Sequence, residues 1–379
     1  MAFFVKLFLL TSISQTIVLT VVPLKAYGVL GSVKAVSVVY VIAGLAGVVG
    51  RLIIPLLVRI MSRTHVLILG CVASVTAAIS FSIGTAANLI WGLLLQTFGV
   101  ACVEVVLTLS LLDHVPRSRL TRFEARRLFF SAIPFTLCPW LGVYLQSNWA
   151  EWVPFAIQGG SSILLFTCYL LQPASALDAR GREATSSNFG GFVTQFFSHP
   201  RLRLAWILAA CRSAWWVMFF VYAPIFAVSG GLGEQAAALV VSAGTFWMLA
   251  IPVWGVVGQR VGLRRLLMGA YAGSAVFSVT AGALMDVSTA AALVLVLAAM
   301  ATTVIDAAGN SLFLRAVRPH ERSEMTAVFV TYRDVAQLAA PVICSALLAF
   351  LSLPAVFFAS GAMMGVAARV ARHIPKTFK

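Results

Sequence analysis

Charged side chains are scarce in this sequence. Aspartate, glutamate, lysine and arginine together make up 10% of its 379 residues, whereas ordinary soluble domains carry about 25%. Hydrophobic residues make up 61% of the chain, and the mean hydropathy is +0.98. Such a chain has too few polar groups to cover a water-soluble surface. The composition therefore excludes a soluble globular protein and predicts a membrane protein.

Residues and motifs typical of metal sites, disulfides or catalytic sites are also few. The five histidines lie at the ends of apolar runs or in polar segments, so an intramembrane metal site has no obvious ligands. The six cysteines lie in six different apolar runs without paired spacing, which favours isolated buried thiols. No nucleophile motif, phosphate-binding loop or cofactor motif is present. The sequence therefore predicts neither an enzyme nor a bound cofactor.

Apolar runs recur from end to end and are long enough to cross a bilayer, for which a helix needs about 20 residues. We predict an all-α membrane protein with twelve transmembrane helices. The first run contains Lys6 and could pass for a signal peptide, but it lacks an obvious small-residue cleavage site, so we interpret it as the first helix. The predicted spans are about 3–24, 36–58, 65–86, 88–112, 127–147, 153–172, 203–229, 235–257, 265–285, 288–314, 325–351 and 353–370.

The net charge of +15 is unevenly distributed. Most lysines and arginines lie at the termini and in alternate connections between the apolar runs, and only Lys25 and Lys34 fall in connections on the opposite side. Because Lys and Arg concentrate on the cytoplasmic side of membrane proteins, both termini are predicted to be cytoplasmic. Acidic lipid head groups are then the expected neighbours, and nucleic acid is not. Short outer loops and absent disulfide spacing favour a multi-pass protein of a bacterial inner membrane.

The two halves of the chain resemble each other at an offset of 201 residues. At this offset Arg59 and Arg63, after the second predicted helix, match Arg260 and Arg264, after the eighth. Six spans separate the copies, so both have the same orientation, as in a parallel repeat. We therefore predict a six-helix bundle over residues 1–172, a cytoplasmic linker over 173–202 and a second six-helix bundle over 203–379.

One copy of this basic connection carries a family resemblance. The stretch Gly255-Val-Val-Gly-Gln259-Arg260-Val-Gly262-Leu-Arg264-Arg265 is similar to the glycine-containing basic signature of the major facilitator superfamily, with Gln259 where the family has an acid. The first copy, around Arg59 and Arg63, lacks both the acid and the glycine of the tight turn. The resemblance implies the fold of that family: twelve helices in two six-helix halves, with both termini in the cytoplasm.

The fifth predicted helix offers a second resemblance. Proton-linked exporters of the family have a Gly-Pro-rich signature there, and Pro139 and Gly142 match it. A kinked helix that packs closely through Gly142 is an equally good interpretation.

Six acidic or basic residues lie deep inside the predicted spans, each seven to ten residues from the cytoplasmic end of its helix. At 1.5 Å per residue, this places them roughly 10–15 Å into a hydrocarbon core about 30 Å thick. Ionisable groups at this depth are costly and usually functional. Three are positive and three negative, which favours mutual pairing. They are Arg51, Glu104, Arg212, Asp306, Arg333 and Asp334.

The family resemblance implies that helices 1, 4, 7 and 10 surround a central cavity, which brings Glu104, Arg212 and Asp306 to its wall. We expect a carboxylate there to take up and release a proton and the arginines to hold an anionic group. Asn310 lies one turn after Asp306 on the same helix face. Aromatic residues of the seventh helix are expected to pack an organic body or a cation. They are Trp215, Trp216, Phe219 and Tyr222.

Structural alternatives remain open for several of these residues. Arg51 and Glu104 are equally well interpreted as an ion pair that joins two helices. Arg333 and Asp334 are adjacent, so their side chains leave a helix about 100° apart and one of them is expected to be structural. The same reasoning applies to Trp215 and Trp216.

The resulting functional prediction is a secondary transporter of a small organic solute that works by alternating access, coupled to protons, with export favoured over uptake. We expect a monomer in the bilayer. The alternative is a membrane receptor or an assembly and delivery factor that has the same fold and does not transport.

Overall fold

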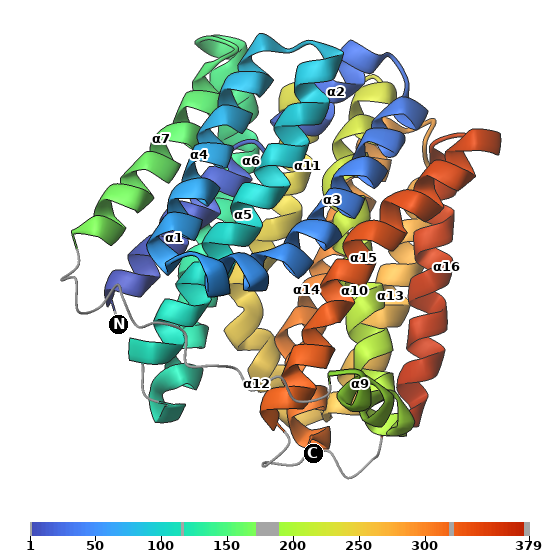
Figure 1. The fold of residues 1–379 in the computed structure, drawn as a ribbon. Helices are drawn as coiled ribbons and strands as arrows, with labels where there is room; N and C mark the ends of the chain where they lie inside the picture. Colours follow the sequence, from blue (N-terminus) through green and yellow to red (C-terminus); the bar gives the residue numbers. More distant parts are fainter. Residues whose placement is uncertain (1, 115–116, 172–188, 318–321, 375–379) are drawn as a thin grey trace. The chain divides into compact units, whose positions relative to one another are not determined.

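The computed structural model describes residues 2–114, 117–171, 189–317 and 322–374. Within these ranges the chain is helical and has no strand. Twelve of the helical segments are long and apolar enough to cross a membrane (Figure 1). The prediction of an all-α protein with twelve membrane-spanning helices is therefore confirmed.

The chain forms two compact units, Met1–Ala184 and Thr185–Lys379. The helices of unit 1 are α1 (Ala2–Thr16), α2 (Val21–Leu30), α3 (Val33–Ile60), α4 (Arg63–Ile83), α5 (Ala86–His114), α6 (Arg117–Asn148) and α7 (Val153–Leu170). Those of unit 2 are α9 (Phe189–Ser198), α10 (Pro200–Ser229), α11 (Glu234–Phe246), η1 (Trp247–Ala250), α12 (Ile251–Val261), α13 (Leu263–Ala283), α14 (Ser288–Ala316), α15 (Arg322–Phe350), α16 (Pro354–Val370) and η3 (Ala371–His373).

The predicted linker, 173–202, falls only partly within the described chain. Residues 172–188 lie outside it, and the rest comprises α9 and the start of α10. The short helix α9 packs against α10 and α15, with Phe196 fully buried and the Phe197 ring 5.5 Å from the ring of Trp206. The assignment of this segment as a linker stays a prediction.

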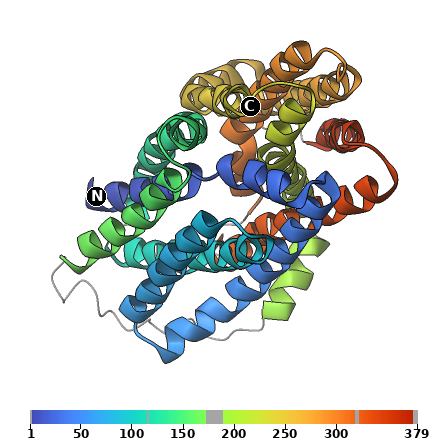
Figure 2. The same cartoon turned by 90° about the horizontal axis from the view of Figure 1, so that it is seen from above.

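The two units repeat one packing scheme. In unit 1, α1 packs against α6 and α7, α4 against α5 and α7, and α3 against α5. In unit 2, α10 packs against α15 and α16, α13 against α14 and α16, and α12 against α14. Each pair in the second set stands six membrane spans after its counterpart in the first. The helices of each unit are seen from above in Figure 2. The duplication inferred from the offset of 201 residues is thus present in the packing.

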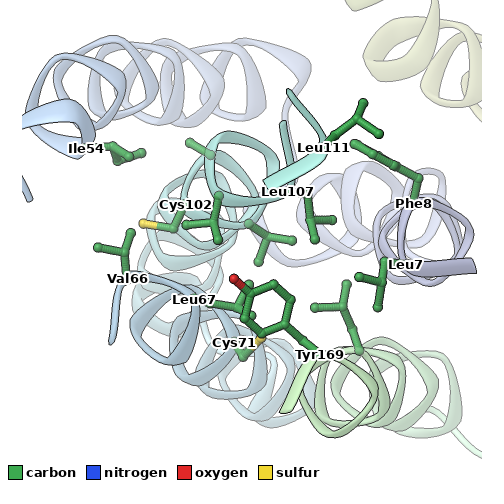
Figure 3. Packing of buried hydrophobic residues seen from close by; sticks show 14 of the residues in the cluster. Leu7, Phe8, Ile54, Val66, Leu67, Cys71, Cys102, Leu107, Leu111 and Tyr169 are labelled. Carbon is green, nitrogen blue, oxygen red and sulfur yellow. The ribbon is translucent and has the colours of Figure 1, made fainter. Parts of the chain in front are cut away.

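The core of unit 1 is a cluster of apolar side chains from α1, α3, α4, α5, α6 and α7 (Figure 3). Tyr169 of α7 extends into this cluster beside Leu67 and Cys71 of α4. Its hydroxyl group lies 3.3 Å from the hydroxyl of Ser110 on α5, and both residues are buried. Apolar burial thus holds the helices together, while the polar end of the tyrosine finds a partner, as buried tyrosines require.

The outer surface of the helices is apolar. Leu52, Leu171 and Phe350 are 74%, 79% and 91% exposed, and many other large hydrophobic side chains are at least one third exposed. So many exposed large apolar side chains are unusual for a soluble monomer. It suits contact with lipid, and the chain is an integral, multi-pass membrane protein.

The two basic connections turn by different means. In unit 2, Gly262 alone separates α12 from α13 and has φ of 89°, a backbone conformation that favours glycine. In unit 1, Met61 and Ser62 separate α3 from α4, both have negative φ, and the Ser62 hydroxyl accepts a hydrogen bond from the backbone N–H of His65. Because this turn is closed by an N-cap serine, the first copy of the signature needs no glycine.

Arg63 supplies an ion pair where the first copy of the signature lacks its acid. Its guanidinium donates to the carboxylate of Asp113, near the end of α5, and Arg63 is only 8% exposed. In unit 2, Gln259 and Arg260 are exposed and Arg264 is half-buried. Arg59 lies on α3, and its side chain is outside the described part of the structure.

The first membrane span is interrupted where α6 crosses it. Helix α1 ends at Thr16 and α2 begins at Val21, and Ile17, Thr20 and Val21 are almost fully buried. A Cβ atom built on Gly142 of α6 would lie 2.0 Å from the backbone oxygen of Ile17. The close-packing interpretation of Gly142 is therefore supported by the geometry: the two backbones approach so closely that only glycine fits.

We expect Gly142→Ala to lower the free energy of unfolding by about 1–3 kcal/mol, because its methyl group would push α6 away from α1. Thermal unfolding of the purified protein measures this. The matched control is Gly160→Ala on α7, where no atom lies within 4 Å of the new Cβ. Equal melting temperatures for the two variants would contradict the close approach.

Candidate functional site

An ion pair lies inside unit 2 between two membrane-spanning helices. Arg212 of α10 places its Nε 3.2 Å from Oδ1 of Asp306 on α14, and the two side chains are 10% and 20% exposed. Each of these residues was predicted from its charge at this depth. The pairing reduces the cost of keeping either charge away from water.

Two aromatic residues complete the contacts of this pair. The indole Nε1 of Trp216 donates a hydrogen bond of 2.9 Å to Oδ2 of Asp306, so each carboxylate oxygen has its own donor. A terminal guanidinium nitrogen of Arg212 donates a bond of 3.0 Å to the hydroxyl of Tyr332 on α15. The guanidinium carbon also lies 5.6 Å from the centre of the Tyr332 ring. We call Arg212, Trp216, Asp306 and Tyr332 the charged cluster.

Hydrogen bonds to α13 hold α10 in the orientation that the charged cluster requires. The buried Tyr271 of α13 donates a bond of 2.7 Å to the backbone oxygen of Leu208, one turn before Arg212. Trp215 donates a bond of 3.0 Å to the hydroxyl of Ser278, also on α13. These contacts fix the rotation of α10 about its axis, so that Arg212 and Trp216 both reach Asp306.

Further aromatic rings pack against Trp216 and Tyr332 of the charged cluster. The Trp216 ring stacks on Phe220, with centroids 5.3 Å apart and planes 19° apart. On α15, Phe329 lies 5.1 Å from the Tyr332 ring and stacks on Phe313 of α14 at 4.2 Å. The cluster therefore combines one positive charge and one negative charge with adjoining aromatic rings.

The two adjacent tryptophans have different hydrogen-bond partners, as their positions in a helix predict. Trp216 contacts Asp306, whereas Trp215 is fully buried, binds α13 and stacks on Phe219. Tyr222 is also buried, farther along α10. Of the predicted aromatic residues, Trp216 is the one whose described contacts include the ion pair.

The remaining predicted residues lie elsewhere. Arg333 is exposed and Asp334 half-buried on α15, directly after Tyr332. Asn310 lies on α14, and its side chain is outside the described part of the structure. Arg51 on α3 and Glu104 on α5 are both half-buried in unit 1. Among the described residues Glu104 takes part in no ion pair, so the alternative of a pair with Arg51 is not found there.

Tyr332 is the member of the charged cluster that sequence reasoning missed. A signal was present, because Tyr332 directly precedes the intramembrane charges Arg333 and Asp334. Successive residues of a helix point about 100° apart. When a charged residue faces away from a site, its neighbour in the sequence can therefore face the site.

The sequence matches the model of a known protein family. The family model described as Major Facilitator Superfamily matches residues 6–251 and 231–377. Since these ranges cover nearly the whole chain, the protein belongs to the Major Facilitator Superfamily. No curated protein has a matching sequence.

Solved structures of transporters share the fold at low sequence identity. The D-xylose-proton symporter is 12% identical, with a TM-score of 0.77 over 99% of this chain and 97% of that one. The nucleoside transporter NupG is 14% identical, with a TM-score of 0.73 over 99% of both chains. A POT family transporter in complex with 5-aminolevulinic acid is 13% identical, with a TM-score of 0.72 over 97% of this chain and 94% of that one.

Removing one charge of the pair should destabilise the protein more than removing both. Arg212→Gln or Asp306→Asn leaves an uncompensated charge in unit 2, which costs up to about 3–5 kcal/mol of unfolding free energy. The double variant Arg212→Gln/Asp306→Asn should recover most of that loss. Thermal unfolding of the three purified variants tests this. A double variant that melts at or below the lower of the two single variants would show that the pair does not carry the stability.

Proposed function

We propose that this protein is a secondary active transporter that moves a small organic solute by alternating access, in exchange for protons. The single observation that carries the proposal is the Arg212–Asp306 pair, a cation and a carboxylate held together between membrane-spanning helices. Family membership supports transport, because the similar structures are those of transporters. The solutes for which those transporters are named, a nucleoside and D-xylose, support a small polar organic solute.

The exchange of proton and solute follows from the chemistry of Asp306. Its carboxylate accepts from Arg212 and from Trp216, so a proton or a positive group of a solute has to compete for the same oxygens. A proton bound on one side of the membrane would then be released when a solute takes its place. Competition for one carboxylate couples the two fluxes in opposite directions, which favours export.

The location of the charges supports a role beyond holding helices together. A pair of apolar side chains would join α10 and α14 without the cost of removing two charges from water. Ionisable groups kept inside a membrane domain commonly mark a path for a substrate or a proton. We propose a bacterial inner membrane as the location, since the basic connections would then face the cytoplasm.

A ligand screen comes first, because the solute is not specified by family membership. We expect at least one small organic solute to raise the melting temperature of the detergent-purified protein. A ligand at 100 times its dissociation constant adds about 2.7 kcal/mol to the unfolding free energy. A protein that binds no solute but purifies with a stoichiometric partner protein would instead support a non-transporting receptor or delivery factor.

Proton coupling is tested in proteoliposomes that contain a pH-sensitive dye. Addition of the transported solute should move protons in the wild-type protein, and Asp306→Asn should abolish this movement while the variant still inserts and binds lipid. The matched control is Asp286→Asn, an exposed carboxylate between α13 and α14. Unchanged proton movement in Asp306→Asn would remove this carboxylate from the mechanism.

A further inference from the structure

We propose that the charged cluster is a two-pole binding site for a short zwitterion, a solute whose carboxylate binds Arg212 while its ammonium group binds Asp306. The inference rests on the proposed transport function and names the class of solute at the same site. It further specifies an apolar or aromatic body attached to the charged groups.

Charge balance in a buried site favours a solute with both charges. A solute with only a negative group would take Arg212 and leave Asp306 without its counter-ion, and a solute with only a positive group would leave Arg212 unpaired. An uncompensated buried charge is strongly unfavourable. A zwitterion replaces one ion pair by two and leaves every charge compensated.

Arg212 and Tyr332 together form a pole for a carboxylate. An arginine has five N–H donors, and the described contacts of Arg212 use one at Nε and one to Tyr332. The others remain available for the two oxygens of a carboxylate, which a guanidinium binds bidentately. The Tyr332 hydroxyl accepts from Arg212, so its own O–H is left to donate to the same group.

Asp306 forms the opposite pole. Each of its oxygens accepts one described contact, and a carboxylate oxygen has a second lone pair. An ammonium group has three donors and no acceptor, so it suits these oxygens. The side chain is 20% exposed, which leaves room for approach. Trp216 would keep its hydrogen bond to Oδ2 and hold the carboxylate in place while the ammonium replaces Arg212.

The distance between the poles limits the solute. Nε of Arg212 and Oδ1 of Asp306 are 3.2 Å apart in the closed pair, so a solute whose two charges are close together replaces the pair with the least separation of the two side chains. An amine and a carboxylate on the same carbon or on neighbouring carbons meet this condition. Trp216 is stacked on Phe220, and Tyr332 lies beside Phe329, so aromatic surface for the body of the solute adjoins both poles.

The proposal is tested with three matched trios of probes at pH 6. Each trio contains an amino acid, its N-acetyl derivative and its amide, so one probe carries both charges, one only the negative charge and one only the positive charge. The parent amino acids are L-phenylalanine, L-leucine and L-tryptophan. Thermal unfolding and calorimetric titration of the full-length protein in detergent measure binding. We expect at least one free amino acid to bind at least about tenfold more tightly than both of its derivatives.

Variants locate the bound zwitterion. Arg212→Gln and Asp306→Asn should each weaken its binding at least about tenfold. Arg201→Gln, an exposed arginine on the same helix as Arg212, and Asp286→Asn are the matched controls and should bind as the wild type does. If the single variants do not fold, the neutral double variant Arg212→Gln/Asp306→Asn replaces them and should bind none of the amino acids.

Four results would overturn the proposal. The first is that only the N-acetyl or amide probes bind, and the second is that the double variant binds the amino acid as tightly as the wild type does. The third is that none of the three amino acids binds. The fourth is that the N-acetyl probe binds more tightly both at lower pH and in Asp306→Asn. The last result would identify a site for an anion together with a proton.

The same experiment separates this inference from the proposed function. If a zwitterion binds as expected but does not cross proteoliposomes, the two-pole site stands and transport fails. If the proteoliposomes transport a solute with a single charge, transport stands and the two-pole site fails.

Discussion

The charges of Arg212 and Asp306 cannot be left alone inside a membrane domain, and this constraint explains much of unit 2. A charge buried without a partner is far costlier than a charge in water. The pair therefore has to stay closed, or be opened only by groups that replace it. Trp216 and Tyr332 each donate to or accept from one member, and α13 holds α10 through Tyr271 and Trp215. Helix α10 therefore carries both the residues of the charged cluster and the contacts that orient them.

Unit 1 has the same packing scheme without the same electrostatics. The residues that stand 201 positions before Arg212 and Trp216 are Thr11 and Gln15, which are uncharged. Both line a small pocket inside unit 1, together with Ser14 and other residues of α1, α4, α5 and α7. Glu104 lies within one residue of the position equivalent to Asp306, and no guanidinium stands where Arg212 stands in unit 2. The duplication preserved helix contacts, whereas the buried charges diverged.

The fold was predictable because its determinants are local and additive. Length, hydropathy and the distribution of basic residues specify membrane spans one at a time, and the repeat is visible in matched positions such as Arg63 and Arg264. The ion pair was predictable in part, since Arg212 and Asp306 were selected by charge and depth. The contact of Tyr332 with Arg212 and the different partners of Trp215 and Trp216 depend on how α10 is rotated about its axis. Contacts with α13 set that rotation, and the hydrophobic pattern of the sequence does not predict them.

The two basic connections show why a signature can lose residues without losing structure. Gly262 is needed where one residue joins two helices at positive φ, but Ser62 caps α4 and makes a glycine unnecessary. The missing acid of the first copy is likewise offset by Asp113, which reaches Arg63 from α5. The first connection has therefore lost the residues of the signature, but it keeps a tight turn and an ion pair. The Arg212–Asp306 pair differs from these connections, because the loss of either charge alone leaves the other buried without a counter-ion. For that reason the charged cluster, rather than the connections, is where the chemistry of this protein has to be sought.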